Sequence, residues 1–160
     1  MTRLFHAAAS LAAIAFALVG YVYLTLPDVR ALRTENPTTT AFMELRDREA
    51  RASGKPQRRE HRWLALGRIS ANLKRAVLVA EDDAFWQHEG IDYRGIMRAA
   101  LRSLVEGRVG PGRWGQGGST ITQQVVKELL LSREKSLRRK MQEWILAKRI
   151  SQHLSKEEIL

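Results

Sequence analysis

GGSTITQQVVKEL, residues 117–129, is the stretch from which the fold is most directly inferred. Thr120 and Gln123 stand three positions apart, as in a capping box, where each side chain binds the other residue's backbone N–H. This spacing predicts a helix over residues 121–131. Side chains at four-residue spacing give one face of it a hydroxyl, an amide and an ammonium: Ser119, Gln123 and Lys127. A helix face of this kind, at a helix N-terminus that follows a glycine-rich segment, can bind phosphate. An ordinary capped amphipathic helix explains the spacing at least as well.

Helical patterns lie on both sides of this stretch. Upstream, Ser70 can cap a helix that ends at Glu81, and Asp92 can cap a second one over residues 93–106. The positions expected to be buried in these two helices are Leu73, Ala76, Val77, Ala80, Ile96, Ala100, Leu101, Leu104 and Val105. Downstream, residues 136–153 form a fourth predicted helix, and SKEE starts a fifth at Ser155. We find no strand pattern, so the expected fold class is all-α.

The composition limits the chemistry that the chain can perform. The 160 residues suffice for one domain with a core in which an acid can be desolvated. The chain has no Cys, which excludes disulfides, a thiolate nucleophile and cysteine-ligated metal. Its formal net charge of +10 attracts polyanions, whether nucleic acid, anionic lipid or a phosphorylated substrate. Six of the 11 glycines lie between residues 107 and 118, which predicts a mobile loop.

The N-terminal segment is apolar. Residues 5–26 carry no formal charge, and a helix of that length crosses a hydrocarbon core of about 30 Å. A cleaved signal peptide would have a shorter apolar region and a clear cleavage site. We therefore expect a membrane anchor over residues 1–26, a charged stalk over 27–62 and a domain over 63–160. Basic residues lie on both sides of the span, so charge counting leaves the orientation open.

Acidic residues in this basic chain are the candidate catalytic groups. Glu81, Asp82 and Asp83 are adjacent and precede Phe85 and Trp86, whose packing would raise the pKa of a buried acid. A solvated Asp82 would only cap or pair, and His88 is expected to make a structural bond across the turn before Gly90. A second stripe has four-residue spacing: Lys135, Arg139 and Glu143. These groups can equally be a polar helix end and surface ion pairs.

Two carboxylates beside a cationic wall suit the transfer of a sugar from a phosphate leaving group. One acid would take the proton of the attacking hydroxyl, and the cations would stabilise the departing phosphate. The ordered stretches EDDAFWQHEGID (81–92), GGSTITQQVVKEL, RKMQE (139–143) and KEEIL (156–160) resemble the successive motifs of the bacterial peptidoglycan glycosyltransferases. The single N-terminal span and short stalk resemble the monofunctional, biosynthetic type.

The resemblance implies a role for each matching residue. Glu81 would be the general base, and Glu143 would assist the departing pyrophosphate, directly or through a divalent cation such as Mg²⁺ or Mn²⁺; the sequence requires no cofactor. The positions that match substrate-binding residues are Ser119, Gln123, Gln124, Lys127, Lys135, Arg139 and Lys140. Supporting positions are Asp82, Phe85, His88, Gly90, Asp92, Gly117, Gly118 and Thr120.

The resemblance also implies the fold, the reaction and the location. The domain would be lysozyme-like, with a lobe that dips into the membrane. It would join lipid II units into β-1,4-linked glycan, inverting the α-anomeric centre and releasing undecaprenyl pyrophosphate. The chain would be a single-pass protein of the cytoplasmic membrane with its domain on the periplasmic face. Its expected partners are lipid II, the growing strand, membrane lipids and other cell-wall synthesis or division proteins, with no nucleic acid.

Three departures from the family pattern are visible. Lys135 stands where many relatives have Arg, which would replace a bidentate phosphate contact by a point charge. Glu128 stands where Asn is frequent and adds an acid near the expected phosphate site. The family's fourth motif continues beyond KEEIL, so the chain is expected to be truncated, poorly stable alone and inactive without further helices.

Two other functions fit parts of the sequence. A lysozyme-like hydrolase would also use a helix-borne Glu, but it has no need of Lys127, Lys135 and Arg139. A membrane-anchored basic module that binds nucleic acid would explain the charge and the span, but not the ordered acids.

Overall fold

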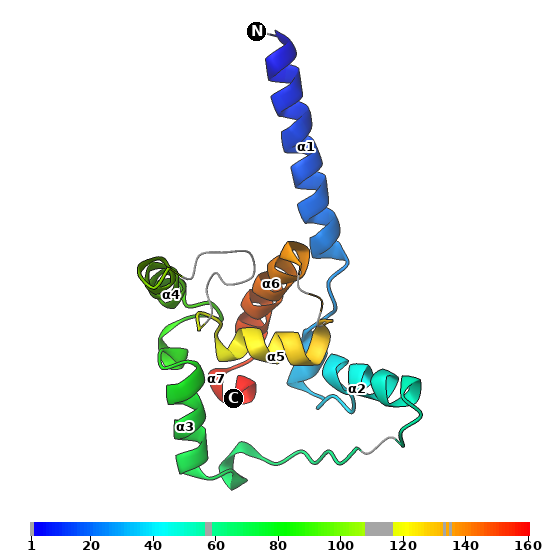
Figure 1. Ribbon diagram of the computed structural model, residues 1–160, viewed down its shortest axis with the longest axis vertical. Coiled ribbons are helices and arrows are strands. Elements are labelled where there is room, and N and C mark those ends of the chain that lie inside the picture. Colours follow the sequence, from blue (N-terminus) through cyan, green and yellow to red (C-terminus); the bar gives the residue numbers. More distant parts are fainter. Residues whose placement is uncertain (1, 57–58, 108–116, 133, 135) are drawn as a thin grey trace.

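The computed structural model describes residues 2–56, 59–107, 117–132, 134 and 136–160, and every regular element within them is helical (Figure 1). The α-helices are α1 (Thr2–Leu24), α2 (Ala41–Ala52), α3 (Ala71–Glu81), α4 (Tyr93–Val105), α5 (Ile121–Leu130), α6 (Leu137–His153) and α7 (Lys156–Ile159). Three 3-10 turns join them: η1 (Arg30–Arg33), η2 (Leu66–Arg68) and η3 (Phe85–Gln87). The expected all-α class is confirmed. Most of the predicted mobile loop, residues 108–116, lies outside the described residues.

Helix α1 stands out from the rest of the chain (Figure 1). Its apolar part, Phe5–Leu24, has 20 residues and a mean hydropathy of 2.0, and only 6% of it is buried within the chain. A helix of that length is about 30 Å long, which matches the hydrocarbon core of a bilayer. Phe16, for example, is 81% exposed. By length and composition, α1 can cross a membrane.

The core lies where α5, α6 and α7 meet. Helix α5 begins with the predicted capping box, in which Thr120 and Gln123 bind each other's backbone N–H groups, and it ends one residue earlier than expected. Apolar side chains from these helices and from the segments before them fill the core: Phe85, Ile91, Ile121, Val126, Leu131, Leu146, Ala147, Ile150 and Ile159. Each large side chain that is fully buried stabilises the fold by about 1.5–3 kcal/mol.

Residues 27–62, expected to form a stalk, also contribute to the domain. Val29 is 2% exposed and joins the core cluster together with Leu26. Helix α2 is capped by Thr40, whose hydroxyl accepts a hydrogen bond from the Met43 N–H, and it packs beside α5. The indole N–H of Trp63 donates to the carbonyl of Pro37 at 3.1 Å. The boundary at residue 63 stays a prediction, but core contacts extend upstream of it.

The burial predicted for α3 and α4 is wrong. Helix α3 contains no buried residue; Leu73 is 57% exposed, and only Leu78 packs against the core. In α4, Leu101, Leu104 and Val105 are all more than half exposed, while Ile96 reaches the core and Ala100 is half-buried. The predicted caps Ser70 and Asp92 make no side-chain capping bond. Apart from Ile96, the apolar side chains predicted to be buried in these two helices are not part of the core or packed against it.

A tight turn at Gly90 brings that joining segment against α6. Gly90 has a φ of +83°, and a Cβ there would lie 2.6 Å from the Ala147 carbonyl oxygen and 2.7 Å from the Ser151 hydroxyl oxygen. Only glycine combines this left-handed backbone with so close an approach to a helix. The predicted supporting position Gly90 is thus required by packing.

We predict that Gly90→Ala lowers the free energy of unfolding by roughly 2–5 kcal/mol, because backbone strain and overpacking add. Gly107→Ala is the matched control, since Gly107 has a φ of +63° but no atom of the described residues within 4 Å of an added Cβ. It should cost only about 1–2 kcal/mol. Denaturant unfolding of both variants in detergent measures the difference, and equal losses would contradict the packing argument.

Candidate active site

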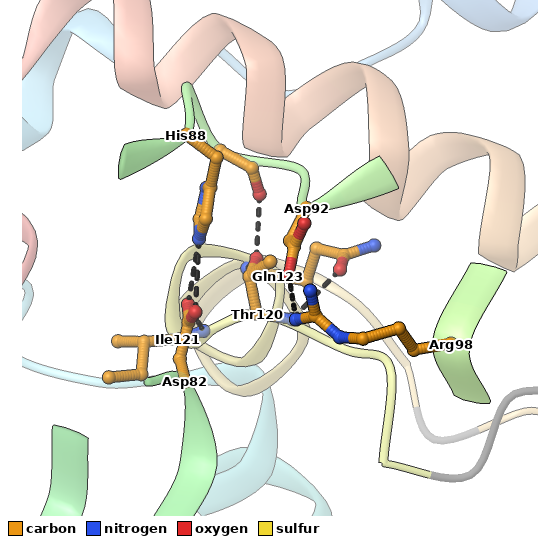
Figure 2. Close-up of polar contacts among 8 residues, drawn as sticks. Asp82, His88, Asp92, Arg98, Thr120, Ile121 and Gln123 are labelled. Carbon is orange, nitrogen blue, oxygen red and sulfur yellow. Dashed lines mark hydrogen bonds and ion pairs between the residues drawn. The ribbon is translucent and has the colours of Figure 1, made fainter. Parts of the chain in front are cut away.

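The carboxylate of Asp82 joins the end of α3 to the start of α5 (Figure 2). One oxygen accepts a hydrogen bond from the Ile121 N–H at 2.9 Å, and both oxygens lie within 3.1 Å of the His88 Nε2. Asp82 is 7% exposed and therefore buried, whereas a solvated Asp82 was considered from the sequence alone. A negative charge at a helix N-terminus is stabilised by the unpaired N–H groups there. Asp82 therefore links the end of α3 to the start of α5 through a buried carboxylate. The structural bond expected of His88 is confirmed as its contact with Asp82.

A second set of buried hydrogen bonds joins the start of α5 to the segment of residues 82–92. The Thr120 hydroxyl donates to the Gly90 carbonyl at 2.6 Å and accepts the Gln123 N–H at 3.2 Å (Figure 2). The Gln123 side-chain oxygen accepts the Thr120 N–H at 2.9 Å. Thr120 and Gln123 are both almost fully buried. This network holds the loop before α5 in one position relative to residues 82–92.

Phe85 is fully buried and belongs to the core cluster. The Lys156 ammonium, from the start of α7, lies 4.3 Å from the centre of its ring, and the His88 ring packs edge-on at 6.4 Å. Burial lowers the pKa of Lys156, while the negative charges of Asp82 and Glu89 act in the opposite direction. The first and last motifs of the sequence are thereby brought into contact.

Glu81, the last residue of α3, lies on the exposed side of the junction between α3 and α5. It is exposed, so the burial expected beside Phe85 and Trp86 is wrong; Asp82 occupies the buried position instead. The Gln124 amide donates to the Glu81 Oε2 at 2.7 Å, which places this carboxylate beside α5. Glu81 lines a cavity of about 190 Å³ together with Asp82, Asp83, Asp92, Arg98, Arg102, Gly117, Gly118, Ser119 and Thr120.

Two residues of this cavity were missed by the sequence reasoning. Arg98 and Arg102 stand one helical turn apart on α4 and face Glu81 and Ser119 across the cavity. Arg98 also donates to Asp92 at 3.3 Å (Figure 2). The four-residue spacing of the two arginines was the available signal, but it is indistinguishable from that of a solvated helix face.

A second cavity, of about 240 Å³, lies on the other side of Ser119. It is lined by Ile96, Ala100, Gly118, Ser119, Gln123, Lys140 and Trp144. The Lys140 ammonium donates to the Ser119 hydroxyl at 3.2 Å. The side-chain N–H₂ of Gln123 is buried without a partner among the described residues, although buried amides are normally paired. The Gly118–Ser119 backbone thus separates a cavity bordered by Glu81 from one bordered by Lys140.

Glu143 is the second acid of the site, and it is 2% exposed. It forms ion pairs with Lys140 and, at 3.2 Å, with Arg139, both one turn earlier on α6. Two guanidinium nitrogens of Arg139 are buried without a hydrogen-bond partner in the described part of the chain. The expected clustering of Arg139, Lys140 and Glu143 is therefore present, with Glu143 inside and Lys140 toward the cavity.

Not all expected site residues converge. The Lys127 ammonium lies 3.3 Å from the Glu128 carboxylate on the exposed side of α5 and lines neither cavity. Lys135 lies outside the described residues. The expected face of Ser119, Gln123 and Lys127 is therefore divided, because Gln123 turns back into the capping box.

The described residues contain no group of three or more His, Asp or Glu side chains that could hold a metal ion. Glu143 pairs with the two cations Arg139 and Lys140. Mg²⁺ is often held by one or two carboxylates together with substrate phosphates, so a divalent cation that binds with the pyrophosphate stays a prediction.

We predict that Asp82→Ala lowers the free energy of unfolding by roughly 2–4 kcal/mol, because the Ile121 N–H and the His88 ring lose their partner while buried. The exposed neighbour Asp83 supplies the control: Asp83→Ala should change the free energy of unfolding by no more than about 0.5 kcal/mol. Similar losses of unfolding free energy for both variants, measured by denaturant unfolding, would show that the Asp82 carboxylate does not hold α3 against α5.

Comparison with known proteins identifies these motifs. Residues 47–160 match the family model described as Transglycosylase. The biosynthetic peptidoglycan transglycosylase of Azoarcus sp. (strain BH72) is 45% identical over 95% of this chain and 63% of its own length. The protein of that name from Aromatoleum aromaticum is 45% identical over 78% of this chain and 52% of its own.

A longer protein with a different name also matches. Penicillin-binding protein 1A of Neisseria gonorrhoeae is 39% identical over 86% of this chain, which corresponds to 16% of that protein. The chain spans between half and two thirds of the length of the biosynthetic relatives reported above. The matched region contains α3 to α7 and both cavities. The chain belongs to the transglycosylase family.

Proposed function

We propose that this chain carries out peptidoglycan glycosyl transfer: it polymerises lipid II into β-1,4-linked glycan and releases undecaprenyl pyrophosphate. The observation that carries the proposal is the arrangement around Ser119, with the exposed carboxylate of Glu81 bordering one cavity and the Lys140 ammonium the other. A synthetic enzyme needs a base for the acceptor and cations for a phosphate leaving group. Family membership and the biosynthetic relatives support this choice.

Glu81 is the proposed general base. Its Oε2 is held by the Gln124 amide at 2.7 Å, which leaves the other carboxylate oxygen for the acceptor's 4-hydroxyl proton. As that proton moves to Glu81, the acceptor oxygen forms a bond to C1 of the donor sugar. The bond between C1 and the pyrophosphate oxygen breaks, and the configuration at C1 is inverted. Exposure leaves Glu81 accessible to a sugar hydroxyl.

Lys140 and Arg139 are the proposed stabilisers of the departing pyrophosphate. Lys140 borders the cavity, and two guanidinium nitrogens of Arg139 have no hydrogen-bond partner among the described residues. Preorganised cations near a developing negative charge lower the barrier because they need no reorganisation during the reaction. Glu143 is buried between them, so its proposed role is to hold both cations in place rather than to touch the leaving group.

The proposed location is the cytoplasmic membrane, with α1 as a single-pass anchor and the domain on the periplasmic face. Helix α1 is long and apolar enough for this role. The orientation follows from the proposed reaction, because lipid-linked glycan is polymerised outside that membrane. Lipid II, the growing strand and membrane lipids are the proposed binding partners.

Glu81→Gln should lower the rate of lipid II polymerisation by roughly 100- to 10,000-fold, because the amide cannot accept the proton. Glutamine can still accept the Gln124 hydrogen bond, so folding should be unchanged. The measurement is polymer formation from labelled lipid II by the full-length protein in detergent. Glu44→Gln on α2, outside both cavities, is the control and should retain activity. Release of free disaccharide instead of polymer would point to hydrolysis and contradict the proposal.

Glu143→Gln should affect both folding and activity, unlike Glu81→Gln. Removing this carboxylate leaves Arg139 and Lys140 without a counter-charge, which costs roughly 2–4 kcal/mol for a partly exposed set. We expect a lower free energy of unfolding and, at temperatures where the variant is folded, a lower turnover with little change in the acceptor's KM. A fully stable, inactive Glu143→Gln protein would instead favour direct contact with the leaving group.

A further inference from the structure

A cavity of about 380 Å³ lies outside the proposed active site, at the junction of α1 and α6. Its walls come from both the N-terminal anchor and the domain. Tyr23, Asp28 and Arg30 belong to the anchor side, and Arg149 and His153 belong to α6. The transfer reaction uses none of these residues.

The position of this cavity along α1 sets its depth in a membrane. The apolar part of the helix ends at Leu24, and Tyr21 and Tyr23 are exposed in its last turn. Tyrosines are enriched where a span leaves the hydrocarbon and enters the headgroup layer. Residues 23–30 therefore lie at the depth of lipid phosphates when α1 spans a bilayer.

Packing fixes α6 at the same depth. Val22, Leu26 and Val29 are buried, and α1 and η1 both pack on α6. The Arg149 guanidinium lies 3.8 Å from the centre of the Tyr23 ring and donates to the Tyr23 carbonyl at 3.1 Å. Arg149 is thus held by the anchor helix through one of its nitrogens, and the guanidinium carries further N–H donors that can bind a ligand.

The charges around the cavity favour an anion. Arg30 donates to both carboxylate oxygens of Asp28 at 2.9–3.1 Å, and this contact lowers the pKa of Asp28 to about 2. Asp28 is therefore ionised and offsets one guanidinium. Arg30 and Arg149 together leave one net positive charge when His153 is neutral. A planar guanidinium binds phosphate oxygens in a bidentate way.

We propose that this cavity binds the phosphate of an anionic membrane phospholipid, held between Arg30 and Arg149 on the side of the membrane that carries the domain. The proposal rests on the membrane anchoring proposed above and not on the transfer reaction. A bound headgroup would fill the space between anchor and domain and would reinforce the angle between α1 and α6.

The test uses the full chain reconstituted in phosphatidylcholine vesicles. Trace amounts of spin-labelled phosphatidylglycerol or spin-labelled phosphatidylcholine report the fraction of lipid immobilised by the protein. We expect a preference for phosphatidylglycerol that falls roughly fivefold in Arg30→Gln, because each basic group near the surface contributes about that factor. Arg149→Gln should give a loss of similar size. No lipid II is present, so the outcome is independent of the proposed reaction.

Arg75→Gln is the matched control, because α3 lies at the end of the domain away from α1 (Figure 1). It removes the same charge and should leave the preference unchanged. Arg30 is exposed and outside the core, so its replacement is not expected to unfold the junction. An equal loss in Arg30→Gln and Arg75→Gln, or an unchanged preference in Arg30→Gln, would overturn the proposal. Displacement of the labelled lipid by millimolar inorganic phosphate would identify a free anion as the ligand and also overturn it.

Discussion

The contact between the Asp82 carboxylate and the Ile121 N–H is the constraint on which the site depends. It joins residues 39 positions apart and carries a charge-assisted hydrogen bond inside the domain. Because Asp82 follows Glu81 directly, fixing Asp82 at the start of α5 also fixes where Glu81 emerges. The Glu81 carboxylate then meets Gln124 on the next turn of α5. The Asp82 contact is buried, whereas the Glu81–Gln124 hydrogen bond beside it is exposed, so Asp82 is the inner of the two polar links between α3 and α5.

The two proposed working acids occupy opposite environments. Glu81 is exposed at the edge of a cavity, as a group that exchanges protons with a substrate must be. Glu143 is buried against Arg139 and Lys140, where it keeps two cations close together despite their repulsion. The Gly118–Ser119 backbone lies between the two groups, with Ser119 hydrogen-bonded to Lys140. In the proposed reaction, this arrangement places the Glu81 carboxylate on the acceptor side and the Lys140 ammonium on the side of the leaving group.

Local spacing predicted the helices well and the long-range contacts poorly. The capping boxes of α5 and α7 were visible because their partners, such as Thr120 and Gln123, are three residues apart. The burial of Asp82 was missed because Ile121, one of its two partners, lies 39 residues away in the chain. Lys127 was placed at the substrate face by four-residue spacing, yet it pairs with Glu128. The exposure of α3 was missed because apolar spacing shows which face could be buried, not whether a neighbour covers it.

Amide hydrogen exchange at Ile121 tests the central constraint most directly. If Asp82 accepts this N–H inside the domain, the Ile121 amide should exchange with the slowest amides of α5, although the first N–H groups of a helix normally exchange rapidly. The amide of Gly118, which precedes the helix, should exchange much faster in the same sample. Exchange of Ile121 as rapid as that of Gly118 would contradict the account, because α3 and α5 would then not be joined at the candidate active site.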